Sequence, residues 1–328
     1  MMWFEELTGF PEISPSDVRK RLSLSATMLT SLENGQSWNC GKLEVSSLCD
    51  LRNRMESIVR SSPLRVSEVV ADIQELHAIR TNSGALFQVA SQFNLLEMVS
   101  PDMTPEQGIG IYQNDFTQGP ACAIAAGAGT IYRNYFAPTN GMIGQSESNQ
   151  IDCLAEVGRA LGNRDRQLWE MRNGYALASA GGLQEISKRL QTSTPDQLDE
   201  LRGQLKVGIQ WGTQVTIGGC SHLVSQIYCS ALPVAYSAYG QNAWKDFAVL
   251  ILEAAYEATL CAAAINSQMT GNKTVFLTLL GGGAFGNETS WIVGAMDRAL
   301  RMHADSGLDV RVVSFKRPNP ALQKLFKM

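Results

Sequence analysis

The second half of the chain alternates between strand-like and helix-like patterns, and this alternation limits the fold more than any other feature. Strand patterns, rich in β-branched and aromatic residues, cover residues 206–217, 222–236, 274–280 and 310–315, and helix patterns cover 246–264 and 288–304. Strands that alternate with helices need crossover connections, which place helices on both faces of a largely parallel or mixed sheet. We therefore predict an α/β fold with three layers, α/β/α.

The first half of the chain fits this architecture less regularly. The patterns predict a strand at residues 85–93, helices at 67–79 and 121–135, a mostly helical region at 153–190, and a charged helix or loop at 192–205. Residues 97–121 and 137–150 are rich in turn-forming and polar residues, so they are predicted to be loops. Residues 140–205 are either a lid or an insertion.

Residues 1–62 are predicted to form an accessory unit ahead of a main domain at 63–328. The accessory unit begins with a hairpin over residues 27–45, because Asn34-Gly35 is a pair that favours a tight turn. A helix over residues 47–60 follows, and Ser61, Ser62 and Pro63 end it. The prediction is therefore a hairpin-plus-helix extension on a three-layer domain.

Composition and charge exclude several classes of protein. The 328 residues carry a formal net charge of −4, so neither nucleic acid nor an anionic membrane is an expected partner. No apolar run reaches about 18 residues, the length of a membrane span, and the N-terminus lacks the basic flank of a secretory signal. The 7 cysteines are scattered without a C-x-x-C pair, which favours reduced thiols in the cytoplasm. With only 3 histidines, none at motif spacing, we expect no metal site and no cofactor.

The strand pattern at residues 274–280 runs directly into a glycine-rich stretch, LLGGGAFGN. Ligands of open α/β sheets bind at the carboxyl ends of strands, and glycine amides ahead of a helix can bind phosphate oxygens. The stretch has neither the Gly-Lys-Ser/Thr of a Walker loop nor a full G-x-G-x-x-G pattern. By itself it is either an anion-binding loop or a plain strand-to-helix turn.

The order of these elements resembles the second half of a macrodomain. The resemblance is carried by VSQIYCSALPVAY, the helix that contains AYEATLCAAA, then TVFLTLLGGGAFGN and VRVVSF. It implies a macrodomain-like fold over about residues 67–316, with ADP-ribose or an ADP-ribosylated protein as the ligand. In that family the glycine loop binds the diphosphate and its aromatic residue lies near the distal ribose. The residues implied as ligand contacts are Gly281, Gly282, Gly283, Ala284, Phe285, Gly286 and Asn287.

Two segments of the first half also resemble this superfamily. ALFQVASQFN is similar to the strand and terminal asparagine that begin the catalytic loop of poly(ADP-ribose) glycohydrolases, which implies that Asn94 binds ribose hydroxyls. Asn94 could equally be a turn residue at the end of the strand. Asp72 and Ile73 are similar to the Asp-Ile pair that binds adenine in macrodomains, although they lie farther from Asn94 than is typical.

The loop TPEQGIGIYQNDFTQGPACA, residues 104–123, contains two candidate catalytic acids, Glu106 and Asp115. Asp115 lies just before a helix of small residues, where a carboxylate is stabilised as an anion or serves only as an N-cap. The resemblance places the catalytic acids of macrodomain-like glycohydrolases in this loop. Poly(ADP-ribose) glycohydrolases have a Gly-Gly-Gly run and a Gln-Glu-Glu motif there, whereas this chain has Glu106, Asp115 and Gln118 as catalytic candidates, with Thr117 and Gly119 as substrate contacts.

A carboxylate in this loop suits cleavage of a glycosidic bond, because it stabilises an oxocarbenium-like transition state or activates water. It can also bind a guanidinium group through two hydrogen bonds. The chain lacks the Gln-Glu-Glu motif and in this respect resembles the branch of the superfamily that removes ADP-ribose from arginine with acidic residues in this loop. We therefore expect a hydrolase that removes ADP-ribose from modified protein side chains, with arginine favoured and Asp115 as the first catalytic candidate.

Two other functions fit the same sequence. A reader or sensor would bind ADP-ribose or an NAD-derived metabolite without turnover and would not need Asp115. An unrelated nucleotide-binding α/β enzyme would not bind ADP-ribose at all. Binding of ADP-ribose separates the third function from the first two, and turnover separates the hydrolase from the reader.

Overall fold

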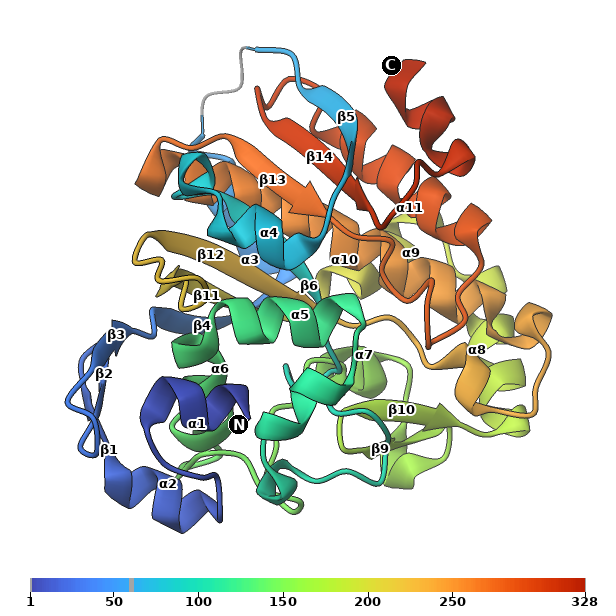
Figure 1. The fold of residues 1–328 in the computed structure, drawn as a ribbon. Coiled ribbons are helices and arrows are strands. Elements are labelled where there is room, and N and C mark those ends of the chain that lie inside the picture. Colours follow the sequence, from blue (N-terminus) through green and yellow to red (C-terminus); the bar gives the residue numbers. More distant parts are fainter. Residues whose placement is uncertain (1, 59–61, 328) are drawn as a thin grey trace.

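A mixed sheet of seven strands lies at the centre of the computed structural model, which describes residues 2–58 and 62–327 (Figure 1). In spatial order its strands are β4 (Lys42–Ser47), β11 (Lys206–Gln214), β12 (Leu223–Cys229), β6 (Leu86–Ala90), β13 (Thr274–Leu277), β14 (Asp309–Ser314) and β5 (Arg65–Val70). Strands β12, β6, β13, β14 and β5 are parallel to one another, and β11 is antiparallel to its neighbours β12 and β4. Five strands therefore have their carboxyl ends at one edge of the sheet.

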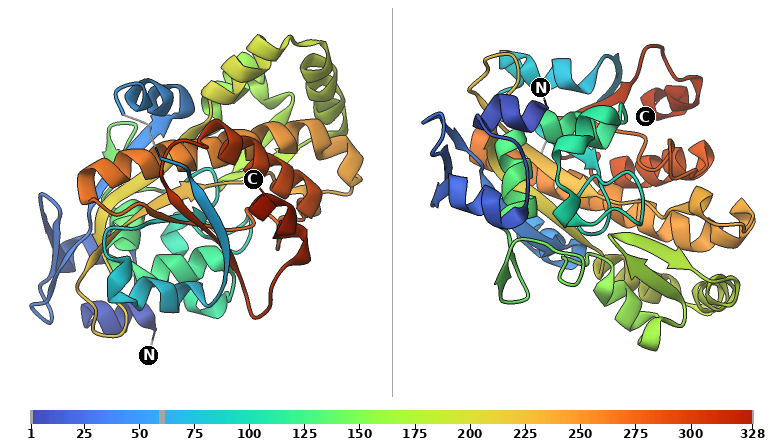
Figure 2. Two further views of the ribbon diagram at one scale, coloured as in Figure 1. Left: turned by 90° about the horizontal axis from the view of Figure 1, so that it is seen from above. Right: turned by 60° about the horizontal axis from the view of Figure 1, so that its bottom comes forward.

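Helices cover both faces of the sheet, which confirms the predicted three-layer α/β/α fold (Figure 2). One face carries α3 (Leu48–Met55), α8 (Ala180–Thr192), α9 (Pro195–Gly203), α10 (Gln241–Thr270) and α11 (Thr289–Met302), and the other carries α4 (Ile73–Ala78), α5 (Gln118–Ala125) and α6 (Gly127–Tyr135). Helix α10 is long and apolar enough to cross a membrane, but 89% of its most apolar window is buried inside the protein. It packs on the sheet and on four helices, as the core helix of a globular domain does.

The N-terminal part contains the predicted hairpin but is not wholly separate from the sheet. Strands β1 (Leu22–Ser25), β2 (Met28–Ser31) and β3 (Ser37–Asn39) form a small antiparallel sheet, and the β2–β3 connection contains Asn34 and Gly35. Helices α1 (Trp3–Thr8) and α2 (Pro15–Arg21) precede it. Strand β4 and helix α3, however, join the central sheet and the α10 layer. The domain boundary at residue 62 stays a prediction, and the predicted helix end at Arg60 and Ser61 lies outside the described residues.

Three segments differ from their predicted secondary structure. Residues 67–79, predicted as one helix, divide into strand β5 and helix α4, because β5 pairs with β14 along its whole length. Residues 121–135 form two helices that break at Ala126, whose ψ of 58° is not helical. Residues 153–190 contain α7 (Ala155–Ala160) and α8, but a hairpin of β9 (Trp169–Arg172) and β10 (Tyr175–Ala178) lies between them. Its turn is Asn173-Gly174 with φ values of 45° and 80°, an Asn-Gly signal that the helical prediction missed.

Candidate functional site

A groove lies at the edge of the sheet where the five parallel strands end, as ligand sites of open α/β sheets do. It consists of two adjoining pockets. The aromatic pocket includes Tyr175, Tyr236 and Phe285 in its wall, and the larger Asp72 pocket includes Asp72 and Ile73. The residues that line both pockets are Asp115, Thr117, Gln118, Thr278, Leu279 and Gly283.

The glycine loop lines the aromatic pocket and presents unpaired backbone donors. Among the described residues, the amides of Gly281, Gly283, Ala284 and Phe285 donate no hydrogen bond to a protein acceptor, and all four residues line the aromatic pocket. Gly281 has a φ of +74°, and a Cβ there would lie 2.4 Å from the Cβ of Ala231. Only glycine fits this position without strain. Free amides ahead of helix α11 suit an anionic group.

The other predicted residues of this loop shape it rather than line the groove. The backbone of Asn287 donates to the carbonyl of Gly281 (2.9 Å), and its side-chain amide donates to the carbonyl of Leu232 (2.8 Å). Gly286 has a φ of +71°, and Gly282 packs beside Ile292. Gly282, Gly286 and Asn287 are absent from the residues that line either pocket. The prediction that these three contact the ligand directly is therefore not supported by their position.

Asp115 lies in the groove, where one of its carboxylate oxygens accepts a backbone hydrogen bond and the other is free to contact a ligand. Its Oδ1 atom accepts a hydrogen bond from the backbone of Thr117 (2.9 Å), and Oδ2 has no protein partner among the described residues. Asp115 is half-buried and lines both pockets. Thr117 is the N-cap position of α5, so the carboxylate lies just before the helix as predicted. Asp115 is the predicted catalytic residue whose position best suits chemistry in the groove.

Gly119 and Gln118 fasten the start of α5 to the end of β6. A Cβ on Gly119 would lie 2.0 Å from the carbonyl oxygen of Ala90, so the helix can approach the strand only with glycine at this position. The side-chain amide of Gln118 accepts from the Ala90 amide (2.9 Å) and donates to the carbonyl of Gln88 (2.8 Å). Both residues line the aromatic pocket. The polar atoms of Gln118 are bound to the strand, so its position supports a structural role, and its catalytic role stays a prediction.

Glu106 and Asn94 are absent from the residues that line either pocket, so their position does not support the predicted catalytic and ribose-binding roles. The exposed carboxylate of Glu106 accepts from the Glu147 amide at 2.9 and 3.0 Å, outside both pockets. Asn94 is fully buried, where its side chain donates to Gln150 (2.8 Å) and accepts from the Leu96 amide (3.1 Å). Loop residues Glu147 and Gln150 thus bind Glu106 and Asn94, and Asn94 also closes a local turn at Leu96, the alternative left open by the sequence.

Asp72 and Ile73 lie together at the end of β5, in the wall of the Asp72 pocket. The Oδ1 atom of Asp72 accepts from the Gln74 amide (2.7 Å), which makes Asp72 the N-cap of α4. Ile73 is 7% exposed. Two exposed aromatic side chains also line this pocket. Phe116 comes from the loop of residues 104–123, called the acidic loop below, and Phe315 follows β14.

The aromatic wall of the other pocket comes from three segments that are distant in sequence. Tyr175, Tyr236 and Phe285 form a cluster with ring centroids 5.2 to 5.7 Å apart. Burial raises the pKa of the Tyr175 hydroxyl, with further contributions from Tyr236 and Asp115. That hydroxyl donates to the carbonyl of Met98 (2.7 Å). Tyr175 and Tyr236 were not predicted, since nothing in the sequence places their loops beside residues 281–286.

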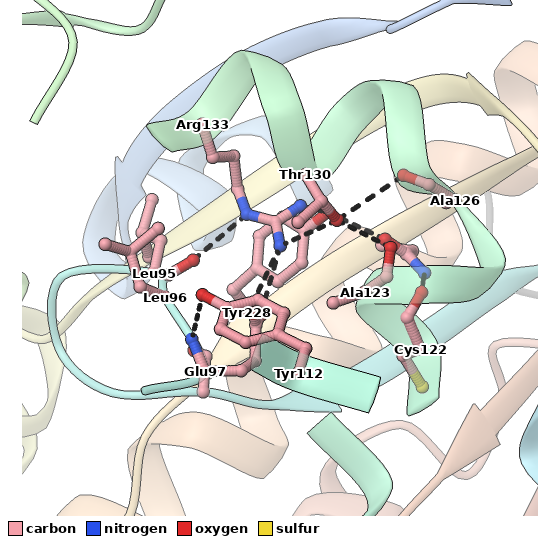
Figure 3. A network of polar contacts seen from close by, with 12 residues as sticks. Leu95, Leu96, Glu97, Tyr112, Cys122, Ala123, Ala126, Thr130, Arg133 and Tyr228 are labelled. Atoms are coloured by element: carbon pink, nitrogen blue, oxygen red, sulfur yellow. Dashed lines mark hydrogen bonds and ion pairs between the residues drawn. The ribbon is translucent and has the colours of Figure 1, made fainter. Parts of the chain in front are cut away.

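A buried ion pair joins Glu97, which lines the aromatic pocket, to Arg133 (Figure 3). Both carboxylate oxygens of Glu97 lie within 3.2 Å of the Arg133 Nη2 atom, and Arg133 Nε donates to the carbonyl of Leu95 (3.0 Å). The guanidinium lies 3.7 Å from the centre of the Tyr228 ring and donates to its hydroxyl. Burial raises the pKa of Glu97 to about 7, although the Arg133 charge opposes the shift. Glu97 borders the pocket, but its carboxylate is bound to Arg133, and no motif in the sequence marks the pair.

Within residues 2–58 and 62–327, no group of three or more His, Cys, Asp or Glu side chains is placed to hold a metal ion. The groove combines free amides, aromatic rings and two carboxylates, Asp115 and Asp72, each with one oxygen that has no partner among the described residues. The amides and rings of this set suit an anionic, nucleotide-like ligand.

No protein-family model matches the sequence, and no curated protein matches it. Among solved structures, the poly(ADP-ribose) glycohydrolase of Thermomonospora curvata is similar at a TM-score of 0.47 and 12% identity, over 95% of this chain and 96% of that one. The poly(ADP-ribose) glycohydrolase of Deinococcus radiodurans in complex with ADP-ribose is similar at a TM-score of 0.47 and 10% identity, over 87% of this chain and 92% of that one. The similarity is loose, with both TM-scores below 0.5, so a function for this chain has to rest on its own residues.

Proposed function

We propose that this protein is an ADP-ribosyl hydrolase that removes ADP-ribose from modified protein side chains, with arginine as the favoured linkage. The observation that carries the proposal is the set of four free amides, at Gly281, Gly283, Ala284 and Phe285, in the aromatic pocket, where Gly283 also lines the adjoining Asp72 pocket. ADP-ribose has the same order of parts: a base and ribose, a diphosphate, and a second ribose.

Each part of the ligand has a matching portion of the groove. The diphosphate would lie on the amides of the glycine loop, where the N-terminus of α11 adds a favourable dipole. The resemblance to macrodomains assigns adenine to Asp72 and Ile73 in the Asp72 pocket. The distal ribose would then enter the aromatic pocket beside Phe285 and Asp115. This orientation brings the bond to the protein side chain next to the carboxylate with a free oxygen.

Asp115 is the proposed catalytic residue. Its Oδ1 atom is fixed by the Thr117 amide, so Oδ2 keeps a constant direction. The carboxylate stabilises the positive charge that develops on the ribose, or accepts a proton from the attacking water. Water adds its oxygen to the anomeric carbon, the glycosidic bond breaks, and the leaving side chain keeps the bonding electrons and gains a proton.

The charge of the aromatic pocket favours an arginine linkage. No Lys or Arg side chain is among the residues that line it, whereas Asp115 and three aromatic rings are. A guanidinium group is attracted by a carboxylate and by aromatic rings. A carboxylate released from a glutamate linkage would meet the negative charge of Asp115 instead.

An ADP-ribose reader is the second candidate. It is favoured by one observation: Glu106 and Gln118 are engaged elsewhere, which leaves Asp115 as the one predicted catalytic side chain with a free polar atom in the groove. Such a protein would bind ADP-ribose with the same loop and cleave no linkage.

Calorimetric titration with ADP-ribose tests the site, and a pair of glycine variants makes the test specific. A Cβ added at position 283 would meet no atom within 4 Å, and φ there lies outside the left-handed region, so Gly283→Leu should fold while its side chain enters the groove. Gly294, exposed on α11 with the same open surroundings, is the matched control. We expect Gly283→Leu to bind at least about tenfold more weakly, a loss of about 1.4 kcal/mol, and Gly294→Leu to bind as the wild type does.

Turnover is then measured with arginine-linked and glutamate-linked ADP-ribosylated proteins and with poly(ADP-ribose). Faster release from arginine supports the proposal. Binding without release from any substrate supports the reader, and absence of ADP-ribose binding rules out both.

A further inference from the structure

We infer that Glu12, in the N-terminal segment between α1 and α2, is a positioning residue for Asp115. Glu12 holds the backbone of the acidic loop from outside the central domain. Its effect on catalysis rests on the proposed function, because Asp115 is the group that it positions.

The Glu12 carboxylate binds the acidic loop at two points and helix α6 at a third. Oε1 accepts from the amide of Ile109 (3.0 Å), and Oε2 accepts from the amide of Gly110 (2.6 Å). The hydroxyl of Tyr135, on α6, also donates to Oε1. A single side chain thus joins the N-terminal segment, the acidic loop and a helix of the central domain.

The loop is shaped to receive this carboxylate. A Cβ on Gly108 would lie 2.4 Å from Glu12 Oε2, and a Cβ on Gly110 would lie 2.9 Å from the same atom. Gly108 also has a φ of +87°, a conformation that favours glycine. The two glycines therefore allow the carboxylate to lie directly against the loop backbone.

Trp3 binds the same loop at two further points. Its indole N–H donates to the carbonyl of Ile109 (3.1 Å), and its backbone amide donates to the side chain of Gln113 (2.9 Å). Trp3 also lines the Asp72 pocket. The N-terminal segment is thus part of the wall of the groove as well as a support for the loop.

The backbone that Glu12 binds is connected to Asp115 through a single turn. Ile109 and Gly110 begin the 3₁₀ turn Gly110–Asn114, and the amide of Asp115 closes the turn by donating to the carbonyl of Tyr112 (3.1 Å). Without the carboxylate, two buried backbone amides would lose their acceptor, and such groups are costly to leave unpaired. The turn would rearrange, and a shift of about 1 Å in a reacting group can lower a rate by about 100-fold.

Glu12→Gln tests this role with Glu6→Gln as its control. Glutamine keeps one carbonyl oxygen but turns an NH₂ group toward one of the two amides, whereas Glu6 is exposed on α1 and its side chain has no partner among the described residues. We expect Glu12→Gln to exchange the amide hydrogens of residues 105–117 faster in mass spectrometry. We also expect kcat to fall by at least about tenfold while KM and ADP-ribose affinity change less than about twofold.

Glu6→Gln should match the wild type in each measurement. Wild-type exchange and kcat in Glu12→Gln would overturn the inference. If Glu12→Gln does not fold, Tyr135→Phe removes only the hydroxyl that donates to the Glu12 carboxylate, and unchanged exchange and kcat in that variant would overturn the inference instead. The exchange comparison does not depend on turnover, so it separates a wrong positioning role from a wrong proposed function.

Discussion

Glu97 and Arg133 form an ion pair in which neither side chain is exposed, with Arg133 Nη2 3.1 Å from Glu97 Oε1. Glu97 follows β6 in the loop that borders the aromatic pocket, and Arg133 projects from α6 (Figure 3). The pair therefore links the loop that borders the aromatic pocket to helix α6. A buried pair of this kind gains little net free energy, but loss of one partner leaves a charge in a dry environment.

Arg133→Met should destabilise the protein by about 3–5 kcal/mol, since it leaves Glu97 buried without a cation and the Leu95 carbonyl without its donor. Urea-induced unfolding measures the change. Arg166→Met is the control, because that side chain is 75% exposed in a long ion pair of 3.7 Å, and its cost should stay within about 0.5 kcal/mol. The double variant Arg133→Met/Glu97→Gln should recover part of the loss, and equal costs for the two single arginine variants would contradict the prediction.

The ion pair also predicts a pH dependence of stability. Burial raises the pKa of Glu97 from 4.5 to about 7 in the folded protein, so the folded form binds this proton more tightly than the unfolded chain does. Stability from this group is therefore greatest below about pH 4.5 and is lost as pH rises toward about 7. Glu97→Gln removes the titration, so the wild type should lose unfolding free energy relative to this variant between pH 5 and pH 8. Parallel urea titrations at the two pH values check this, and an equal change in both proteins would refute it.

The sequence predicted the order of strands and helices in the second half because each element there has a long, uniform pattern. It also placed the glycine loop and Asp115 at the correct edge of the sheet, since the carboxyl ends of parallel strands share that edge. Strand β5 was mistaken for a helix because its pairing partner, β14, lies about 240 residues later in the chain. There Glu68 accepts hydrogen bonds from Ser314 and Asn319, contacts that no local pattern contains.

The candidate site was predicted less completely, because residue type does not reveal a side chain's partner. Asn94 and Gln118 have the right chemistry for ligand contacts, yet their amides bind Gln150 and the backbone of β6. Tyr175 enters the pocket only because the β9–β10 hairpin folds toward the glycine loop. Contacts between segments that are distant in sequence thus decide which polar residues remain free for a ligand.

Two glycines of the same loop should differ strongly in the stability that the protein loses when each is replaced by alanine. Gly281→Ala should cost about 2 kcal/mol or more, because its φ of +74° is unfavourable for alanine and the Cβ would lie 2.4 Å from Ala231. Gly283→Ala should stay within about 0.5 kcal/mol, since nothing lies within 4 Å of the added carbon. Thermal or urea unfolding of the two variants gives the comparison. A neutral Gly281→Ala would mean that the loop adopts another conformation in solution.

Asp115→Asn should separate binding from turnover. Asparagine keeps the Oδ1 acceptor for the Thr117 amide and nearly the same shape, so the loop and the amides of the glycine loop should stay in place. The negative charge is lost, and a carboxylate that assists glycosidic cleavage contributes about 100-fold or more to the rate. We therefore expect kcat on arginine-ADP-ribosylated protein to fall by at least about 100-fold, while ADP-ribose affinity changes only a few-fold.

Glu106→Gln makes the same chemical change in the same loop and should leave the rate unaltered, because the Glu106 carboxylate binds the Glu147 amide away from the groove. Initial rates and calorimetry on both variants form one experiment. Full activity of Asp115→Asn would remove Asp115 from the mechanism, and an equal loss in Glu106→Gln would point to a general effect on the loop. A fall in kcat confined to Asp115→Asn, with ADP-ribose still bound, would show that the carboxylate takes part in the chemical step. A reader with the same groove cleaves no substrate, so loss of the Asp115 charge could not change its rate.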